Sequence, residues 1–94
     1  MPHVDINQAT ALALRAERAI SGMTLRDLAR ASGVPRSTLV RVLDASREIR
    51  VTTVDQLAEA MGIPALTIHE RAYELMRREG GAARPPTAKG AESA

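Results

Sequence analysis

The chain has 94 residues, a formal net charge of +2, 45% apolar residues and no cysteine. This length fits one domain, and a sequence without cysteine excludes disulfides, thiolate metal sites and cysteine nucleophiles, as in a protein of the reducing cytoplasm. No apolar run approaches the roughly 20 residues of a membrane span, and the start of the chain lacks the basic and apolar regions of a signal peptide, so we expect no membrane partner.

The first predicted helix begins after Asp5, an N-cap residue whose capping-box partner is Gln8, three positions later. It runs to about residue 20 and is expected to keep Arg15 and Arg18 in solvent. Its apolar residues recur at helical spacing and are expected to face the core. They are Leu12, Ala16 and Ile20, followed by Met23.

Residues 24–44 predict two short helices joined by a sharp turn. The first begins at Thr24, with Asp27 three positions later in a capping-box-like start. Gly33 ends it, because glycine adopts the positive φ that stops a helix within one residue. Pro35 suits the first position of the second helix, where its missing N–H leaves no hydrogen bond unmade.

The apolar residues of this motif predict how its two helices pack. Ala29 supplies the small residue that a close, steep helix crossing needs. Four larger apolar residues wedge the second helix against the first or face the core: Val34, Leu39, Val42 and Leu43. This geometry is the helix-turn-helix, which presents its second helix to the major groove of DNA.

Over residues 25–42 the chain resembles the lambda-repressor/Cro-like (XRE-type) helix-turn-helix family, through the pattern L-x-x-L-A-x-x-x-G-V-x-x-S-T-L-x-R-V. Leu25 departs from the family, which often has at this position a glutamine that contacts phosphate. The resemblance implies an all-α fold, a compact five-helix lambda-repressor-like domain over residues 1–79. It also implies a cytoplasmic, nucleoid-associated transcriptional repressor of a bacterial cell or a phage-infected host. We expect it to act as a homodimer on a palindromic operator in double-stranded DNA.

The start of the second motif helix is expected to lie against the base edges, where four side chains project: Arg36, Ser37, Val40 and Arg41. Either arginine can bind O6 and N7 of a guanine, which discriminates by about 1–3 kcal/mol. Ser37 can donate or accept with less selectivity, and Val40 can contact a thymine methyl group. The resemblance supports Arg36, Ser37 and Arg41 most strongly.

Five side chains are expected to contact DNA phosphates: Thr24, Arg26, Thr38, Arg47 and Arg50. Such contacts fix the register of the protein without reading the sequence. Arg47 and Arg50 belong to a predicted loop over residues 45–51, and the alternative is that both are merely exposed or paired with Glu48.

The charge distribution favours the DNA interpretation. Residues 15–50 carry eight arginines against four carboxylates, a net charge of +4, whereas residues 51–79 carry three against five, a net charge of −2. All but one of the basic residues in the chain are arginine, which binds phosphates and guanine edges in a forked geometry.

A fourth helix is predicted from Thr53, with Gln56 completing another capping box, to Gly62. Its apolar face is Val54, Leu57, Ala58 and Met61.

A fifth helix is predicted from about Pro64 to Glu79, with one apolar stripe made of Ile68, Ala72, Leu75 and Met76. Leu66 and Tyr73 lie off this stripe and are candidate dimer contacts. The alternative for Tyr73 is packing at the edge of the core with its hydroxyl in water. Residues 80–94 hold no large apolar side chain to offset the ordering entropy, so a flexible tail is expected there.

Other functional classes were weighed against DNA binding. A helix-turn-helix can be a protein-interaction module, as in an antitoxin-like or phage accessory protein that binds a host protein, but Arg36 and Arg41 argue against it. A structural protein would oligomerise through its fifth helix. An enzyme is not expected: His69 and Glu70 begin like the zinc motif HExxH, but Tyr73 replaces its second histidine. We also expect no cofactor, no metal and no small-molecule ligand.

Overall fold

The computed structural model of the protein describes residues 4–79, and the tail predicted over residues 80–94 lies outside that range. The described chain forms α1 (Ile6–Ser21), α2 (Leu25–Ser32), α3 (Arg36–Leu43), α4 (Val51–Met61) and α5 (Ala65–Glu79). No strand occurs within residues 4–79, and the all-α prediction is confirmed. In the same range, no helix has the length and apolar character that crossing a bilayer requires.

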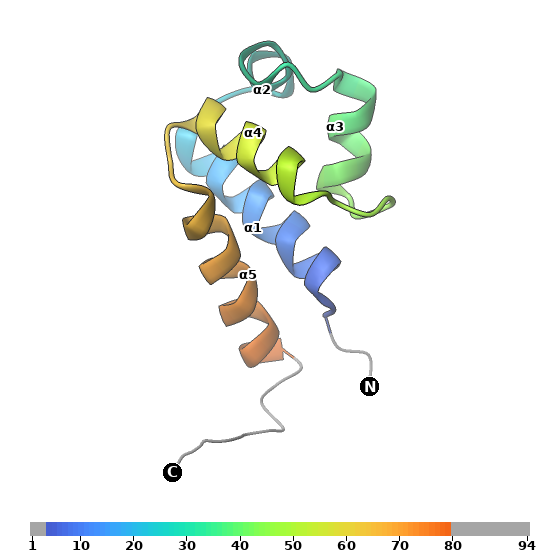
Figure 1. Cartoon of the computed structure of the whole chain (residues 1–94), viewed down its shortest axis with the longest axis vertical. Helices are drawn as coiled ribbons and strands as arrows, with labels where there is room; N and C mark the ends of the chain where they lie inside the picture. The colour runs from blue at the N-terminus through green and yellow to red at the C-terminus, as the bar shows by residue number, and fades with distance from the viewer. Residues whose placement is uncertain (1–3, 80–94) are drawn as a thin grey trace.

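Helix α1 is the scaffold on which the other helices are arranged. It packs against α3, α4 and α5, most extensively against α5, which runs back alongside it in the opposite direction (Figure 1). Helices α2 and α3 pack against each other at the top of the view in Figure 1. Helix α4 contacts α1, α2 and α5. The helix-turn-helix therefore packs against α1 through α3 and against α4 through α2.

Two of the three predicted capping boxes are present. Gln8 N–H donates to Asp5 Oδ1 at 2.8 Å while Asp5 N–H donates to Gln8 Oε1 at 3.1 Å. Asp27 N–H likewise donates to Thr24 Oγ1 at 3.0 Å, and the reciprocal bond to Asp27 Oδ2 measures 3.3 Å. Gly33 ends α2 with φ +79°, as predicted. Each box satisfies two of the N–H groups that a helix start leaves free.

The predicted start of α4 was wrong. The helix begins at Val51 rather than Thr53, and its N-cap residue, Arg50, makes no side-chain capping bond. A contact distant in sequence sets this boundary: Asn7 Oδ1 accepts a hydrogen bond from Ile49 N–H at 2.8 Å, and Ile49 packs against the core. Similarly, Pro35 is the extended N-cap of α3 with ψ 144°, so that helix begins one residue later than expected.

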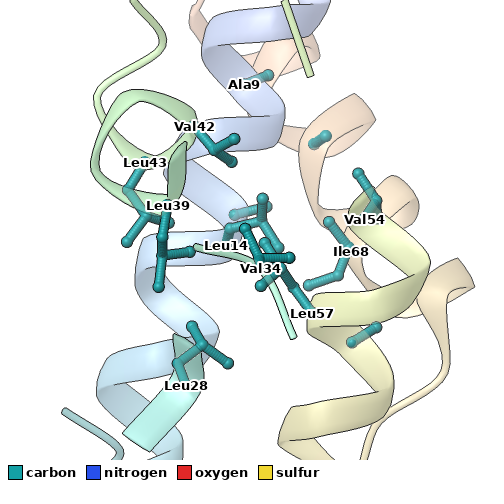
Figure 2. Packing of buried hydrophobic residues seen from close by; sticks show 13 residues of the cluster. Ala9, Leu14, Leu28, Val34, Leu39, Val42, Leu43, Val54, Leu57 and Ile68 are labelled. Atoms are coloured by element: carbon teal, nitrogen blue, oxygen red, sulfur yellow. The ribbon is translucent and has the colours of Figure 1, made fainter. Parts of the chain in front are cut away.

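The core is aliphatic, as the composition requires, and all three inward-facing residues predicted for α3 belong to it (Figure 2). Its buried members are Ala9, Ala13, Leu14, Leu28, Val34, Leu39, Val42, Leu43, Val54, Leu57, Ala58, Ile68 and Ala72. Because residues from every helix meet in one cluster, the position of α3 is fixed by the packing of the whole domain.

The inward face predicted for the first helix was wrong at Leu12 and Ile20, whereas Met23 packs against the core as expected. Leu12 is 36% exposed and Ile20 is 70% exposed, whereas Ala9, Ala13 and Leu14 are fully buried. Alanine contributes little to a hydrophobic pattern, yet its short side chain allows neighbouring helices to pack close to α1. The inward face therefore follows the alanines and Leu14 rather than the larger residues. Arg18, expected in solvent, is half-buried.

Candidate nucleic-acid interface

Helix α3 buries one side and exposes the other. Leu39, Val42 and Leu43 anchor it in the core, while the four side chains predicted to contact bases lie together on its exposed side. These are Arg36, Ser37, Val40, which is 43% exposed, and Arg41. None of the four side chains makes a hydrogen bond or ion pair with another residue in the described range 4–79. The arrangement gives a rigid helix with two arginines, a hydroxyl and a small apolar group available to a ligand.

Thr24 and Arg26 are exposed at the start of α2. The Thr24 hydroxyl oxygen accepts the bond from Asp27 N–H, so this side chain takes part in its own capping box. The hydrogen bonds that Asp27 accepts from Thr24, aided by the charges of Arg30 and Arg26, lower the pKa of its carboxyl group. Thr38, a further phosphate-contact candidate, is half-buried on α3.

A hollow at the start of α2 brings basic side chains of three helices together. Arg18 of α1, Arg26 of α2 and Arg36 of α3 all line it. Arg18 Nη1 donates to Met23 O at 2.7 Å, which holds its guanidinium under the turn that leads into α2, and its Nε is buried without a partner among the described residues. Helical spacing predicted an Arg18 in solvent, because its bond to Met23 depends on how the chain turns between the two helices.

The loop between α3 and α4 carries Arg47 and Arg50, both exposed. Neither forms an ion pair with Glu48 or any other residue between positions 4 and 79. The loop is held by Asn7 of α1, whose Nδ2 donates to Arg47 O at 3.0 Å and whose Oδ1 accepts from Ile49 N–H. No local pattern in the sequence predicts this role of Asn7, because its partners lie 40 and 42 positions away.

The C-terminal end of α3 is closed by a tight turn. Asp44 Oδ1 accepts a hydrogen bond from Ser46 N–H at 2.8 Å. Hydrogen bonding by Ser46 lowers the pKa of the Asp44 carboxyl group, with smaller contributions from the charges of Arg41 and Arg15. Arg15 Nη1 also donates a long bond of 3.5 Å to Leu43 O. Ala45 completes the turn at φ +61°, in the left-handed region.

The two candidate dimer contacts lie on the outer side of α5, away from the core residues Ile68 and Ala72. Leu66 is 63% exposed and Tyr73 is 59% exposed. The helical spacing of residues 66, 70, 73 and 77 places Glu70 and Arg77, both exposed, on the same side. This outer face of α5 thus combines two apolar groups with one carboxylate and one guanidinium.

Within residues 4–79, no group of three acidic, histidine or cysteine side chains is suited to hold a metal.

A rigid helix-turn-helix with an exposed, basic second helix defines a class of DNA-binding domain. The family model described as Helix-turn-helix matches residues 14–68. The chain therefore belongs to the lambda-repressor/Cro-like (XRE-type) helix-turn-helix family.

Among solved structures, a transcription regulator is similar to this chain. The chain is similar to the clp gene regulator ClgR from C. glutamicum, with 29% sequence identity and a TM-score of 0.74, over 80% of this chain and 96% of that one. No curated protein matches the chain. Family and structural similarity together make the protein a DNA-binding transcription regulator.

Proposed function

We propose that the protein is a sequence-specific transcriptional repressor of phage or bacterial type that binds a palindromic operator as a homodimer. The exposed side of α3 carries this proposal: two arginines without partners in the described range stand on a helix that the core holds in place. The bound protein and RNA polymerase would then compete for the same promoter DNA, so occupancy of the operator alone would repress transcription.

In this proposal α3 lies in the major groove. Arg36 and Arg41 bind guanines through O6 and N7, Ser37 adds a less selective hydrogen bond, and Val40 contacts a thymine methyl group. Five further residues bind phosphates and fix the register: Thr24, Arg26, Thr38, Arg47 and Arg50. Because these residues lie at both ends of the motif, they could contact the DNA backbone on both sides of the major groove.

The outer face of α5 is the proposed dimer contact. Leu66 and Tyr73 would be covered by the same face of a second copy. Glu70 and Arg77 give each copy one carboxylate and one guanidinium on this face, so the face is complementary in charge to itself, as a two-fold axis requires. The two α3 helices related by that axis would contact half-sites about 34–36 Å apart.

The test begins with selection of duplexes from a random DNA pool by the purified protein. Binding of the selected duplex and of its scrambled version is then measured by fluorescence anisotropy across salt. Arg36→Ala with Arg41→Ala should reduce the affinity for the selected duplex to that for the scrambled one. Arg47→Ala with Arg50→Ala removes the same charge, but it should weaken both duplexes alike and preserve the preference.

A palindromic selected sequence, and lower transcription from a promoter that contains it, support the dimeric repressor. Equal, weak and salt-sensitive binding of the wild-type protein to every duplex would refute sequence-specific regulation. A protein-interaction module would then be the better description of the chain.

A further inference from the structure

A second hollow lies on the outer side of the motif turn, between α2 and the start of α3. Arg26, Arg30 and Arg36 surround it, and small apolar residues, among them Ala29 and Val34, form its floor. We call this hollow the outer groove. It shares Arg26 and Arg36 with the hollow that contains Arg18, so the two hollows together are lined by four arginines from three helices and by one carboxylate, that of Asp27. Only Arg26 and Arg36 of these were expected to contact DNA.

Arg30 is the basic side chain of the outer groove without an assigned role. It is exposed in the last turn of α2 and, among residues 4–79, makes no hydrogen bond or ion pair. The nearby carboxylate of Asp27 already accepts the capping-box hydrogen bond from Thr24 N–H. The pKa of the Asp27 carboxyl group is lowered mainly by its hydrogen bonds with Thr24, and the nearby charge of Arg30 lowers it further. Three like charges around one hollow are best relieved by a bound anion.

We propose that the outer groove binds a backbone phosphate of DNA outside the bases that α3 contacts, with Arg30 as its main donor. This inference rests on the proposed function and extends its footprint. Two observations favour DNA over an acidic protein segment. Arg36 belongs to both the outer groove and the base-contacting side of α3. In this geometry, moreover, the first motif helix crosses the DNA backbone, which brings α2 to the flanking strand.

The experiment compares Arg30→Ala with Arg78→Ala, which removes an equal charge from exposed α5. The probes are two duplexes with the selected sequence, one ending at that sequence and one with about six extra base pairs on each side, roughly half a helical turn. On the longer duplex, Arg30→Ala should lower affinity about three- to tenfold and reduce the slope of log K against log salt by about 0.9 per protomer. Arg30→Lys should restore most of the slope.

On the shorter duplex Arg30→Ala should have little effect, because the flanking phosphate is missing. Thermal unfolding of each variant verifies that the domain remains folded. Identical affinities and slopes for Arg30→Ala and Arg78→Ala on the longer duplex would overturn this inference alone. That outcome would make the outer groove a candidate surface for an acidic protein. Wild-type protein that binds no duplex would overturn the proposed function as well.

Discussion

At the scale of single residues, the least expected contact is the ion pair between Glu17 and Arg71. Glu17 is buried between α1 and α5, and its Oε2 accepts a hydrogen bond from Arg71 Nε at 2.9 Å and lies 2.7 Å from Arg71 Nη2. The two residues are 54 positions apart, so no local pattern relates them. A buried carboxylate is tolerated because this partner compensates its lost hydration.

Removal of the arginine alone should therefore be strongly destabilising. Arg71→Ala leaves the buried charge of Glu17 unpaired, and we expect the free energy of unfolding to fall by about 2–4 kcal/mol in urea denaturation followed by circular dichroism. The double variant Glu17→Leu with Arg71→Leu should recover most of that loss, because an apolar pair needs no compensation. Wild-type stability of Arg71→Ala would show that water reaches Glu17.

Ala45 is the second informative residue. Its φ of +61° lies in the left-handed region, where a Cβ atom is disfavoured by about 1–2 kcal/mol. Ala45→Gly should raise the free energy of unfolding by about 1 kcal/mol, measured by thermal denaturation. Ala19→Gly, at an exposed position inside α1, should instead lower it by a similar amount. Equal destabilisation by both substitutions would mean that the turn at Ala45 carries no strain.

At the scale of elements, α1 does more than fill the core, because Asn7 holds the loop between α3 and α4. Asn7→Ala removes both hydrogen bonds to the loop backbone. We expect faster amide hydrogen exchange at Ile49 and weaker binding of every duplex, with the preference for the selected sequence unchanged. Asn7→Asp keeps the acceptor for Ile49 N–H and should protect that amide. An unchanged exchange rate in Asn7→Ala would show that packing alone holds the loop.

The boundaries of the helices show which features the sequence could predict and which it could not. Capping boxes at Asp5 and Thr24 were predicted correctly because all their partners lie within three residues. The start of α4 was not, since the bond between Asn7 and Ile49 overrides the local signal at Thr53.

The candidate interface follows the same division. The exposed face of α3 was predictable from helical spacing, whereas Arg18, Arg30 and Asn7 acquire their positions from the way the helices meet. The inward face of α1 was mispredicted for a different reason, because buried alanines such as Ala9 and Ala13 give a weaker pattern than exposed Leu12 and Ile20.

At the scale of the whole molecule, the two helix-turn-helix motifs of the proposed dimer need a fixed separation. The outer face of α5 is proposed to provide it. Leu66→Glu with Tyr73→Glu should shift the protein toward monomer in sedimentation velocity and weaken binding to a palindromic duplex more than to a single half-site. Val51→Glu, which also places a charge at an exposed apolar position, is the control and should sediment as wild type. A dimer that persists in the double variant would assign the contact to another surface.

Tyr73 also determines how the protein can be observed by light. It is the single aromatic residue of the chain, which has no tryptophan and no phenylalanine. The aliphatic core is therefore optically silent in the near ultraviolet, and intrinsic emission arises at the proposed subunit contact alone. A titration of protein concentration, followed by tyrosine anisotropy, would report association without an attached dye. Unfolding, by contrast, has to be followed through the backbone.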